Sequence, residues 1–175
     1  MKTPLRYPGG KTRAVKHILP LIPDDVERVC SPFFGGGSVE MALANKGIKV
    51  FGYDKMKQLV WFWNALCGDS ERLADEVESL RETFVDRNGN SVVGCSKDSF
   101  QSFREDLKTD SFMFSYERAA KFYAINRSSF SGATFSGGWS EKAATARFTD
   151  SSVQRLGILR LRTSDSIMQT SKMPF

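Results

Sequence analysis

The segment best suited to chemistry is glycine-rich and reads Ser-Pro-Phe-Phe-Gly-Gly-Gly-Ser over residues 31–38. It stands where an expected strand turns into an expected helix, and consecutive glycines there let the backbone approach a ligand that any Cβ would obstruct. Asp54 follows Gly35 by about the separation expected of an acidic residue that ends the second strand and accepts hydrogen bonds from ribose hydroxyls. The turn and the aspartate together predict a nucleoside site. The alternative is a tight turn and an aspartate that only caps the next helix.

The glycines do not follow the two common phosphate-binding patterns. No Gly-Lys-Ser/Thr closes them, as a Walker loop requires, and Pro-Phe-Phe precedes them, unlike the dinucleotide fingerprint. A cofactor with a nucleoside but without a phosphate therefore fits the turn better.

The elements that must position these residues form one βαβ unit in the sequence pattern. We expect a strand over residues 26–30, a helix over 38–45 and a second strand over 48–53, with a right-handed crossover. Gly47 supplies the helix stop, because glycine adopts the left-handed conformation at little steric cost. Ahead of the unit, turn-rich residues 4–11 lead into a helix expected over 12–21.

After Asp54 the pattern becomes helical. Amphipathic helices are expected over residues 59–66, 73–84, 100–107 and 116–125. Residues 86–90 form a loop or hairpin tip, residues 128–140 form a loop rich in serine, glycine and aromatic residues, and residues 155–162 return to strand. The run from Asp86 is not a calcium loop, because its glycine comes two positions early and Lys97 replaces the closing glutamate.

Length and composition indicate one ordinary globular domain. The 175 residues are 41% hydrophobic and 26% charged, which allows one core and excludes disorder, collagen and a multi-domain array. Lys plus Arg number 25 against 20 Asp plus Glu, and the net charge of +5 suits a polyanionic partner.

Cysteine and histidine usage excludes several kinds of site. Cys30, Cys67 and Cys95 lack the paired spacing of a disulfide framework or a thiolate zinc site, so we expect a reducing, cytoplasmic location. His17 is the single histidine, which argues against Ser-His-Asp hydrolysis and His-rich metal sites. We expect no metal and no membrane, since no apolar run reaches the roughly 18 residues that span a bilayer.

Four short motifs occur in a defined order along the chain. They read Tyr-Pro-Gly-Gly-Lys at residues 7–11, Pro-Phe-Phe-Gly-Gly-Gly at 32–37, Gly-Tyr-Asp at 52–54 and Asn-Arg-Ser-Ser-Phe-Ser-Gly at 126–132. In these motifs the chain resembles the Dam-type (D12 class) DNA adenine-N6 methyltransferases. The resemblance implies site-specific methyl transfer from S-adenosylmethionine to adenine N6 in double-stranded DNA, as in restriction-modification, with the base flipped out of the duplex.

The resemblance also implies an architecture. The fold class is α/β, with a Rossmann-like S-adenosylmethionine-dependent methyltransferase core whose sheet is incomplete and a mostly helical inserted DNA-recognition region. The implied boundaries are residues 1–54 for the first, cofactor-binding part of the core, 55–149 for the target-recognition insertion and 150–175 for the return to the core.

The cofactor-binding residues implied by the resemblance are Tyr7, Gly9, Gly10, Lys11, Pro32, Phe33, Gly35, Gly37, Asp54 and Asp165. Lys11 would lie close to the methionine end of S-adenosylmethionine, since a lysine and a glycine turn suit a carboxylate. Asp54 would bind the ribose and Asp165 would lie near the adenine. Many family members have glutamate where this chain has Ser31, which removes one carboxylate from the pocket.

DNA contacts are expected within the insertion. The residues concerned are Arg118, Lys121, Asn126, Arg127, Ser129 and Phe130, with Lys142 and Arg147 as further phosphate partners and Phe135 and Trp139 as further stacking groups. The alternative is a solvated charged face, and we assign the aromatic residues 61–63 to core packing.

The Asp-Pro-Pro-Tyr motif, with which the family holds the adenine amino group, does not occur in the 175 residues. We therefore expect no catalytic residue in this chain and no activity from it alone. Three explanations stay open: a truncated reading frame, which we favour, half of a split enzyme whose second chain supplies the motif, or a non-catalytic DNA- or nucleotide-binding module derived from the family. A parallel sheet without its later strands would leave an open edge that invites a partner.

Overall fold

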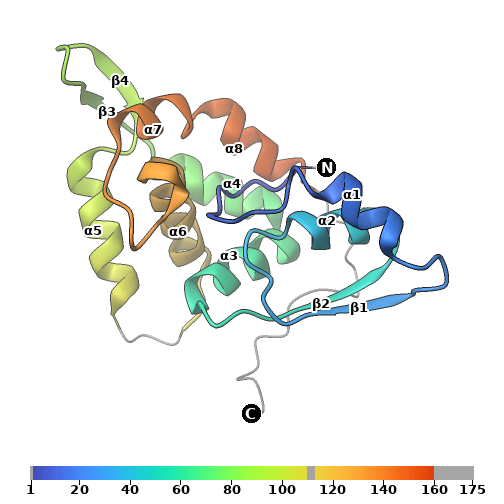
Figure 1. The fold of residues 1–175 in the computed structure, drawn as a ribbon. Coiled ribbons are helices and arrows are strands. Elements are labelled where there is room, and N and C mark those ends of the chain that lie inside the picture. The colour runs from blue at the N-terminus through green and yellow to red at the C-terminus, as the bar shows by residue number, and fades with distance from the viewer. Residues whose placement is uncertain (1, 110–112, 160–175) are drawn as a thin grey trace.

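The structure is a computed structural model that describes residues 2–109 and 113–159 (Figure 1). Its N-terminal part begins with helix α1, Val15–Ile18, which continues into the 3-10 helix η1, Leu19–Leu21. The expected helix over 12–21 is therefore present in a shorter form, and Pro20 in η1 lacks the backbone N–H that an α-helix would need.

The predicted βαβ unit is confirmed. Strand β1, Arg28–Ser31, pairs in parallel with β2, Lys49–Gly52, and helix α2, Ser38–Asn45, connects them. The register pairs Ser31 with Gly52, so both strands end at the same edge of the sheet. In Figure 1 the two strands run side by side at the lower right, with α2 above them.

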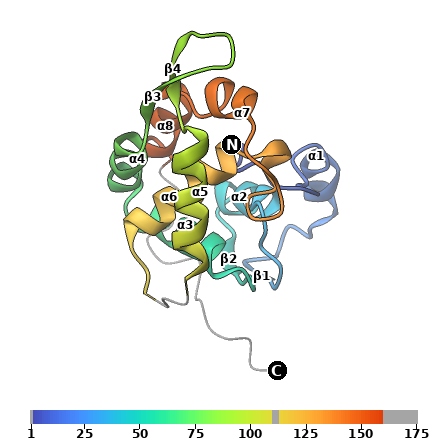
Figure 2. The ribbon, with the colours of Figure 1, turned by 90° about the vertical axis from the view of Figure 1, so that its left-hand side faces the viewer.

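Helices make up the larger part of the described chain. The four longest in the described residues are α3, Lys57–Gly68, α4, Ser70–Ser79, α5, Lys97–Lys108, and α6, Tyr116–Ser128. Helix α6 packs against the other three, as the two views of Figures 1 and 2 agree. Phe62 of α3 stacks on Tyr123 of α6 with ring centroids 5.6 Å apart, and Trp61 and Trp63 are buried, as predicted for core packing.

A β-hairpin replaces the end of the predicted helix over 73–84. Helix α4 ends at Ser79, and β3, Glu82–Val85, pairs antiparallel with β4, Ser91–Gly94. Thr83 and Val85 face solvent while Phe84 packs against Trp139, and this alternation of β-prone residues decides the strand. The hairpin projects from the rest of the molecule in Figure 2.

The hairpin tip is held by Asp86. Its Oδ1 accepts hydrogen bonds from the backbone N–H groups of Asn88 at 2.9 Å and Asn90 at 2.8 Å, and Gly89 has a positive φ of 84°. The carboxylate thus closes a turn, as an Asx motif does.

The C-terminal described segment is helical, which corrects the strand expected over 155–162. Short elements η2, Phe130–Gly132, and α7, Glu141–Ala146, precede α8, Asp150–Gly157. Thr149 and Ser152 form a capping box that starts α8, and the buried residues Val153 and Leu156 lie on one face. The rest of the expected strand, residues 160–162, lies outside the described residues.

Two further observations concern the described part of the chain alone. No helix there is long and apolar enough to cross a membrane. No group of three histidine, cysteine, aspartate or glutamate side chains gathers there to hold a metal ion.

Candidate functional site

The N-terminal Tyr-Pro-Gly-Gly-Lys segment lies directly against the glycine-rich turn. A Cβ added at Gly36 would lie 2.7 Å from Tyr7 Cβ, and one at Gly35 would lie 3.1 Å from Tyr7 Cε1. Gly10 N–H donates to Tyr7 O at 2.9 Å, which closes a turn in which Gly9 has a φ of 75°. The close approach of Tyr7 therefore requires glycine in the turn even before a ligand is considered.

The two adjacent phenylalanines of the turn lie in opposite environments. Phe34 is buried against Trp63, with ring centroids 5.0 Å apart, and its ring fills the space that a Cβ at Gly52 would need. Trp63 Nε1 donates to Gly35 O at 3.1 Å and so fixes the turn to α3. Phe33 is 80% exposed and lines the rim of the cavity beside the turn. Phe34 thus anchors the turn, while Phe33 is free to meet a ligand.

Asp54 ties the glycine turn to the start of α3. Its Oδ2 accepts from Gly35 N–H at 2.9 Å and its Oδ1 accepts from Met56 N–H at 2.9 Å. A carboxylate offers about four lone-pair positions, so these two bonds leave capacity for ligand hydroxyls. Burial raises the pKa of the Tyr7 hydroxyl, and the negative charge of Asp54 raises it further. Asp54 therefore has the capping role given by the alternative interpretation and keeps acceptor positions that these two bonds do not use.

A cavity of about 170 Å³ lies between the N-terminal segment, the turn and the first turn of α2. Besides Tyr7, its titratable lining residues are Lys11 and Glu40. Lys11 Nζ donates to Gly9 O at 2.9 Å, and Glu40 Oε1 accepts from Ser31 Oγ at 2.7 Å. One cation and one anion therefore line the same small cavity.

Glu40 is the functional candidate that sequence reasoning missed. Glu40 lies in the first turn of α2, where acidic side chains are common because the positive end of the helix dipole stabilises them. Only the contact with Ser31, nine residues earlier, shows that a carboxylate stands at the position where the sequence indicates one has been lost.

Among the expected DNA-binding residues, Asn126 and Ser129 are fully buried. Asn126 Oδ1 accepts from Arg6 N–H at 3.0 Å, and its Nδ2 donates to Arg6 O at 2.7 Å and Gly132 O at 3.1 Å. Ser129 Oγ accepts from Thr134 N–H at 3.0 Å. Both side chains are thus used within the protein in this conformation, and the DNA contact expected of them stays a prediction. Asn126 instead ties the N-terminal segment to the end of α6.

Three of the expected cations also make internal bonds. Arg127 donates from Nε and Nη2 to Arg147 O at 2.9 and 2.6 Å and from Nη1 to Pro4 O at 3.3 Å. Arg118 Nη2 donates to Asp106 O at 2.9 Å, and Lys121 Nζ pairs with Asp106 Oδ2 at 2.9 Å. Arg118 and Lys121 thus hold α6 against α5.

Phe130 is 70% exposed, in contrast to the buried Asn126 and Ser129. It begins η2, and the next residue, Ser131, has a left-handed φ of 55° that a non-glycine residue rarely adopts. Phe135 and Trp139 pack instead against the core, and Trp139 Nε1 donates to Cys95 O at 2.9 Å. Of the three loop aromatics, Phe130 alone presents its ring to solvent.

Comparison with known proteins assigns these motifs to one family. Residues 7–172 match the D12 class N6 adenine-specific DNA methyltransferases. The chain belongs to this family. It is 26% identical over 136 residues to the type II methyltransferase M.MjaIII of Methanocaldococcus jannaschii, an alignment that covers 73% of this chain and 46% of that relative. The chain thus spans about half the length of the curated relative that it matches.

A D12 class methyltransferase needs a methyl donor, and the cavity at the glycine turn fits the polar parts of such a molecule. Asp54 retains lone pairs beside the glycine turn, and Lys11 and Glu40 bring opposite charges to one cavity. The matched range includes Asp165, which lies outside the described residues.

Proposed function

We propose that this chain binds S-adenosylmethionine and recognises DNA as part of a site-specific adenine-N6 methyltransferase. The observation that carries the proposal is the meeting of three motifs at one edge of the sheet. The glycine turn follows β1, Asp54 follows β2, and Tyr7 lies across the turn. In open α/β sheets, ligands bind outside the carboxyl ends of the parallel strands.

The proposed fold is a Rossmann-like core that begins with β1, α2 and β2. On this reading residues 55–149 are the inserted target-recognition region, which agrees with the helices α3 to α7 and the hairpin found there. Residues 150–175, which begin with α8, are then proposed to return to the core. Among the described residues the parallel sheet has two strands and no strand pairs with the other side of β1, where Cys30 is exposed.

We propose that the nucleoside end and the amino-acid end of the cofactor are bound by different residues. The carboxylate of Asp54 would accept hydrogen bonds from the ribose hydroxyls, beside the exposed ring of Phe33. The amino-acid end carries an ammonium and a carboxylate, which would pair with Glu40 and Lys11. The cavity of about 170 Å³ is below the roughly 300 Å³ of the smallest usual ligand pockets, so it suits this end alone.

When bound, S-adenosylmethionine supplies an electrophilic methyl group. The contribution of this chain is to hold the donor in one orientation, since positioning is most of what such an enzyme provides. The sequence contains no Asp-Pro-Pro-Tyr. We therefore propose that the groups that hold the adenine amino group lie outside these 175 residues, in a longer chain or in a second one.

Double-stranded DNA is the proposed substrate, and Phe130 is the proposed stacking residue. Its exposed ring could stack on an unpaired base or enter the space that a flipped base leaves. We place the enzyme in the cytoplasm, in keeping with three free cysteines.

Calorimetry with S-adenosylhomocysteine, the demethylated product, tests the proposal. We expect binding that adenosine alone reproduces only weakly, because adenosine lacks the charged amino-acid end. Absence of any heat or melting-temperature change at millimolar ligand would reject the cofactor site.

The alternative function is a non-catalytic DNA- or nucleotide-binding module, which the missing motif favours. A methyl-transfer assay with a segment that carries Asp-Pro-Pro-Tyr separates the two functions. Only a methyltransferase part gains activity when that segment is added.

A further inference from the structure

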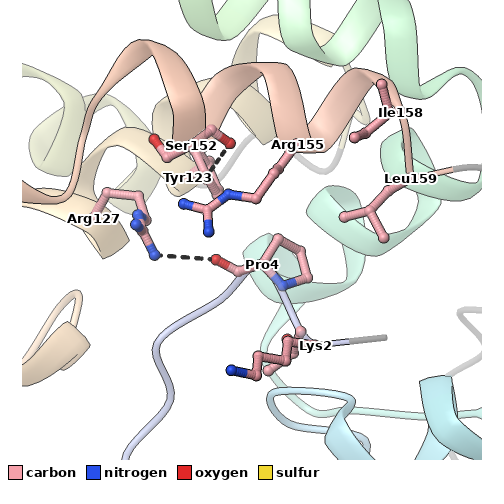
Figure 3. Close-up of a pocket in the computed structure, with 9 residues that line it drawn as sticks. Lys2, Pro4, Tyr123, Arg127, Ser152, Arg155, Ile158 and Leu159 are labelled. Carbon is pink, nitrogen blue, oxygen red and sulfur yellow. Dashed lines mark hydrogen bonds between the residues drawn. The ribbon is translucent and has the colours of Figure 1, made fainter.

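A second cavity, of about 460 Å³, opens between the N-terminal segment, α6 and α8 (Figure 3). It shares no lining residue with the cavity at the glycine turn. Three cations line it, Lys2, Arg127 and Arg155, and among the described residues no acidic side chain does. We call this space the cationic cleft.

The two arginines of the cleft point toward the same space. In Figure 3 the guanidinium groups of Arg127 and Arg155 lie beside each other, with Lys2 across the opening. In the described part of the chain, Arg127 donates to the backbone carbonyls of Pro4 and Arg147, and its guanidinium lies 5.9 Å from the centroid of the Tyr123 ring. Its donors are thus partly satisfied, but its charge is not neutralised.

Neighbouring arginines increase the unbalanced charge. Burial lowers the pKa of Arg127, the interaction with Tyr123 acts in the opposite direction, and the positive charges of Arg155 and Arg147 lower the pKa further. Burial and the charges of Arg147 and Arg127 act in the same direction on the pKa of Arg6. None of these four arginines forms an ion pair with an acid in residues 2–109 or 113–159. Like charges gathered in a partly dry site cost free energy unless an anion joins them.

Arg155 is not needed to hold the fold. Its side chain is exposed, and within the described residues it donates one hydrogen bond, from Nε to Ser151 O at 2.9 Å in the same helix. A cation that faces a cavity without an internal acidic partner is available to a ligand. The apolar walls, Pro4 and the 77% exposed Ile158, suit the sugar beside a phosphate.

We infer that the cationic cleft binds a backbone phosphate of DNA, with Arg127, Arg155 and Lys2 as its positive lining. The inference rests on the proposed function, because DNA is the polyanion that such an enzyme meets. Guanidinium groups offer planar donor pairs that match phosphate oxygens. The positive charge of three cations around one cleft is also larger than a ligand with a single carboxylate would need for pairing.

The test is the affinity of the protein for a short duplex across a range of salt concentrations. Arg155→Gln should weaken binding about fivefold to tenfold near 0.1 M salt and lower the slope of log affinity against log salt by about one. Arg155→Lys should keep the slope, since it keeps the charge. Arg28→Gln on exposed β1 removes the same charge outside the cleft and should leave the slope unchanged.

The outcomes separate this inference from the proposed function. If the wild type binds no duplex at low salt, the DNA role itself fails. If the wild type binds and Arg155→Gln matches Arg28→Gln, the inference alone fails. A melting temperature that inorganic phosphate raises in the wild type but not in Arg155→Gln, with equal duplex affinities, would assign the cleft to a free phosphate and overturn the assignment to DNA.

Discussion

At the scale of single residues, Asp54 combines a structural and a proposed binding role. Asp54→Ala removes the acceptor for Gly35 N–H and Met56 N–H and the proposed ribose ligand. We expect affinity for S-adenosylhomocysteine to fall by about 1.5 to 3 kcal/mol, as for hydrogen bonds to a charged group, together with a lower melting temperature. Calorimetry and thermal denaturation measure both, with exposed Asp25→Ala as the control. A lower melting temperature with unchanged affinity would leave Asp54 as a turn cap only.

The contact between Ser31 and Glu40 makes a second residue-scale prediction. Glu40→Gln should weaken S-adenosylhomocysteine about tenfold, since a charge-assisted hydrogen bond is lost, and should leave 5′-methylthioadenosine unaffected because that ligand lacks the amino-acid end. The double variant Ser31→Glu with Glu40→Gln places the carboxylate at residue 31 instead of residue 40. It should restore the affinity. Equal losses for both ligands would mean that Glu40 only stabilises α2.

The neighbouring phenylalanines show where residue-level prediction stops. The sequence indicates a ligand-approach turn, but it cannot tell which of Phe33 and Phe34 is buried. The difference depends on the space above Gly52 and on the edge of Trp63, both contributed by other elements. Glu40 was missed for the same reason, because its partner lies across the turn rather than at helical spacing.

At the scale of elements, Asn126 fastens the N-terminal segment to the end of α6. Asn126→Ala leaves Arg6 N–H, Arg6 O and Gly132 O without their partner, which should cost on the order of 2 to 4 kcal/mol of unfolding free energy. Urea denaturation measures the loss, with exposed Asn88→Ala as the control. If Asn126→Ala kept full stability but lost DNA binding, the DNA contact expected from the sequence would be supported.

The elements predicted from strong local signals are present. The βαβ unit follows from short apolar runs and the stop at Gly47, and these signals act locally. The hairpin was hidden because apolar residues continue at helical spacing from Leu73 into Phe84, while the strand depends on Trp139 far along the chain. The prediction of a strand from residue 155 was wrong because it did not take into account the capping box at Thr149. The sequence does contain this local signal.

At the scale of the whole molecule, the family was predictable because its motifs are short, ordered and spread over the chain. The proposed DNA contacts were less predictable. The composition gives the number of cationic residues but not which of them bond within the protein. In the structure, Arg118 and Lys121 join α6 to α5. Arg155, which composition did not single out, faces the cationic cleft.

The prediction at the scale of the whole molecule concerns methyl transfer by the purified chain. The purified chain should bind cofactor product and DNA but transfer no methyl group to adenine, because the sequence has no Asp-Pro-Pro-Tyr to hold the amino group. Adding a chain or segment that carries this motif should restore incorporation of tritiated methyl, and replacing its aspartate should abolish it. Incorporation by the 175-residue chain alone, lost in Asp54→Ala, would show that residues assigned here to binding perform the chemistry.

The hydrogen bond between Arg6 and Asn126 joins residues that are 120 positions apart in the sequence. It can therefore form only late in synthesis of the chain. A ribosome delivers the N-terminus first, so Tyr7 and the glycine turn emerge long before α6 is available to hold them. Contacts between residues so distant in sequence form slowly, because a long loop must close first. We expect ribosome-stalled chains to bind S-adenosylhomocysteine only once Gly132 has left the exit tunnel. Binding by chains stalled before Asn126 emerges would show that the β1–α2–β2 unit completes the cofactor cavity without α6.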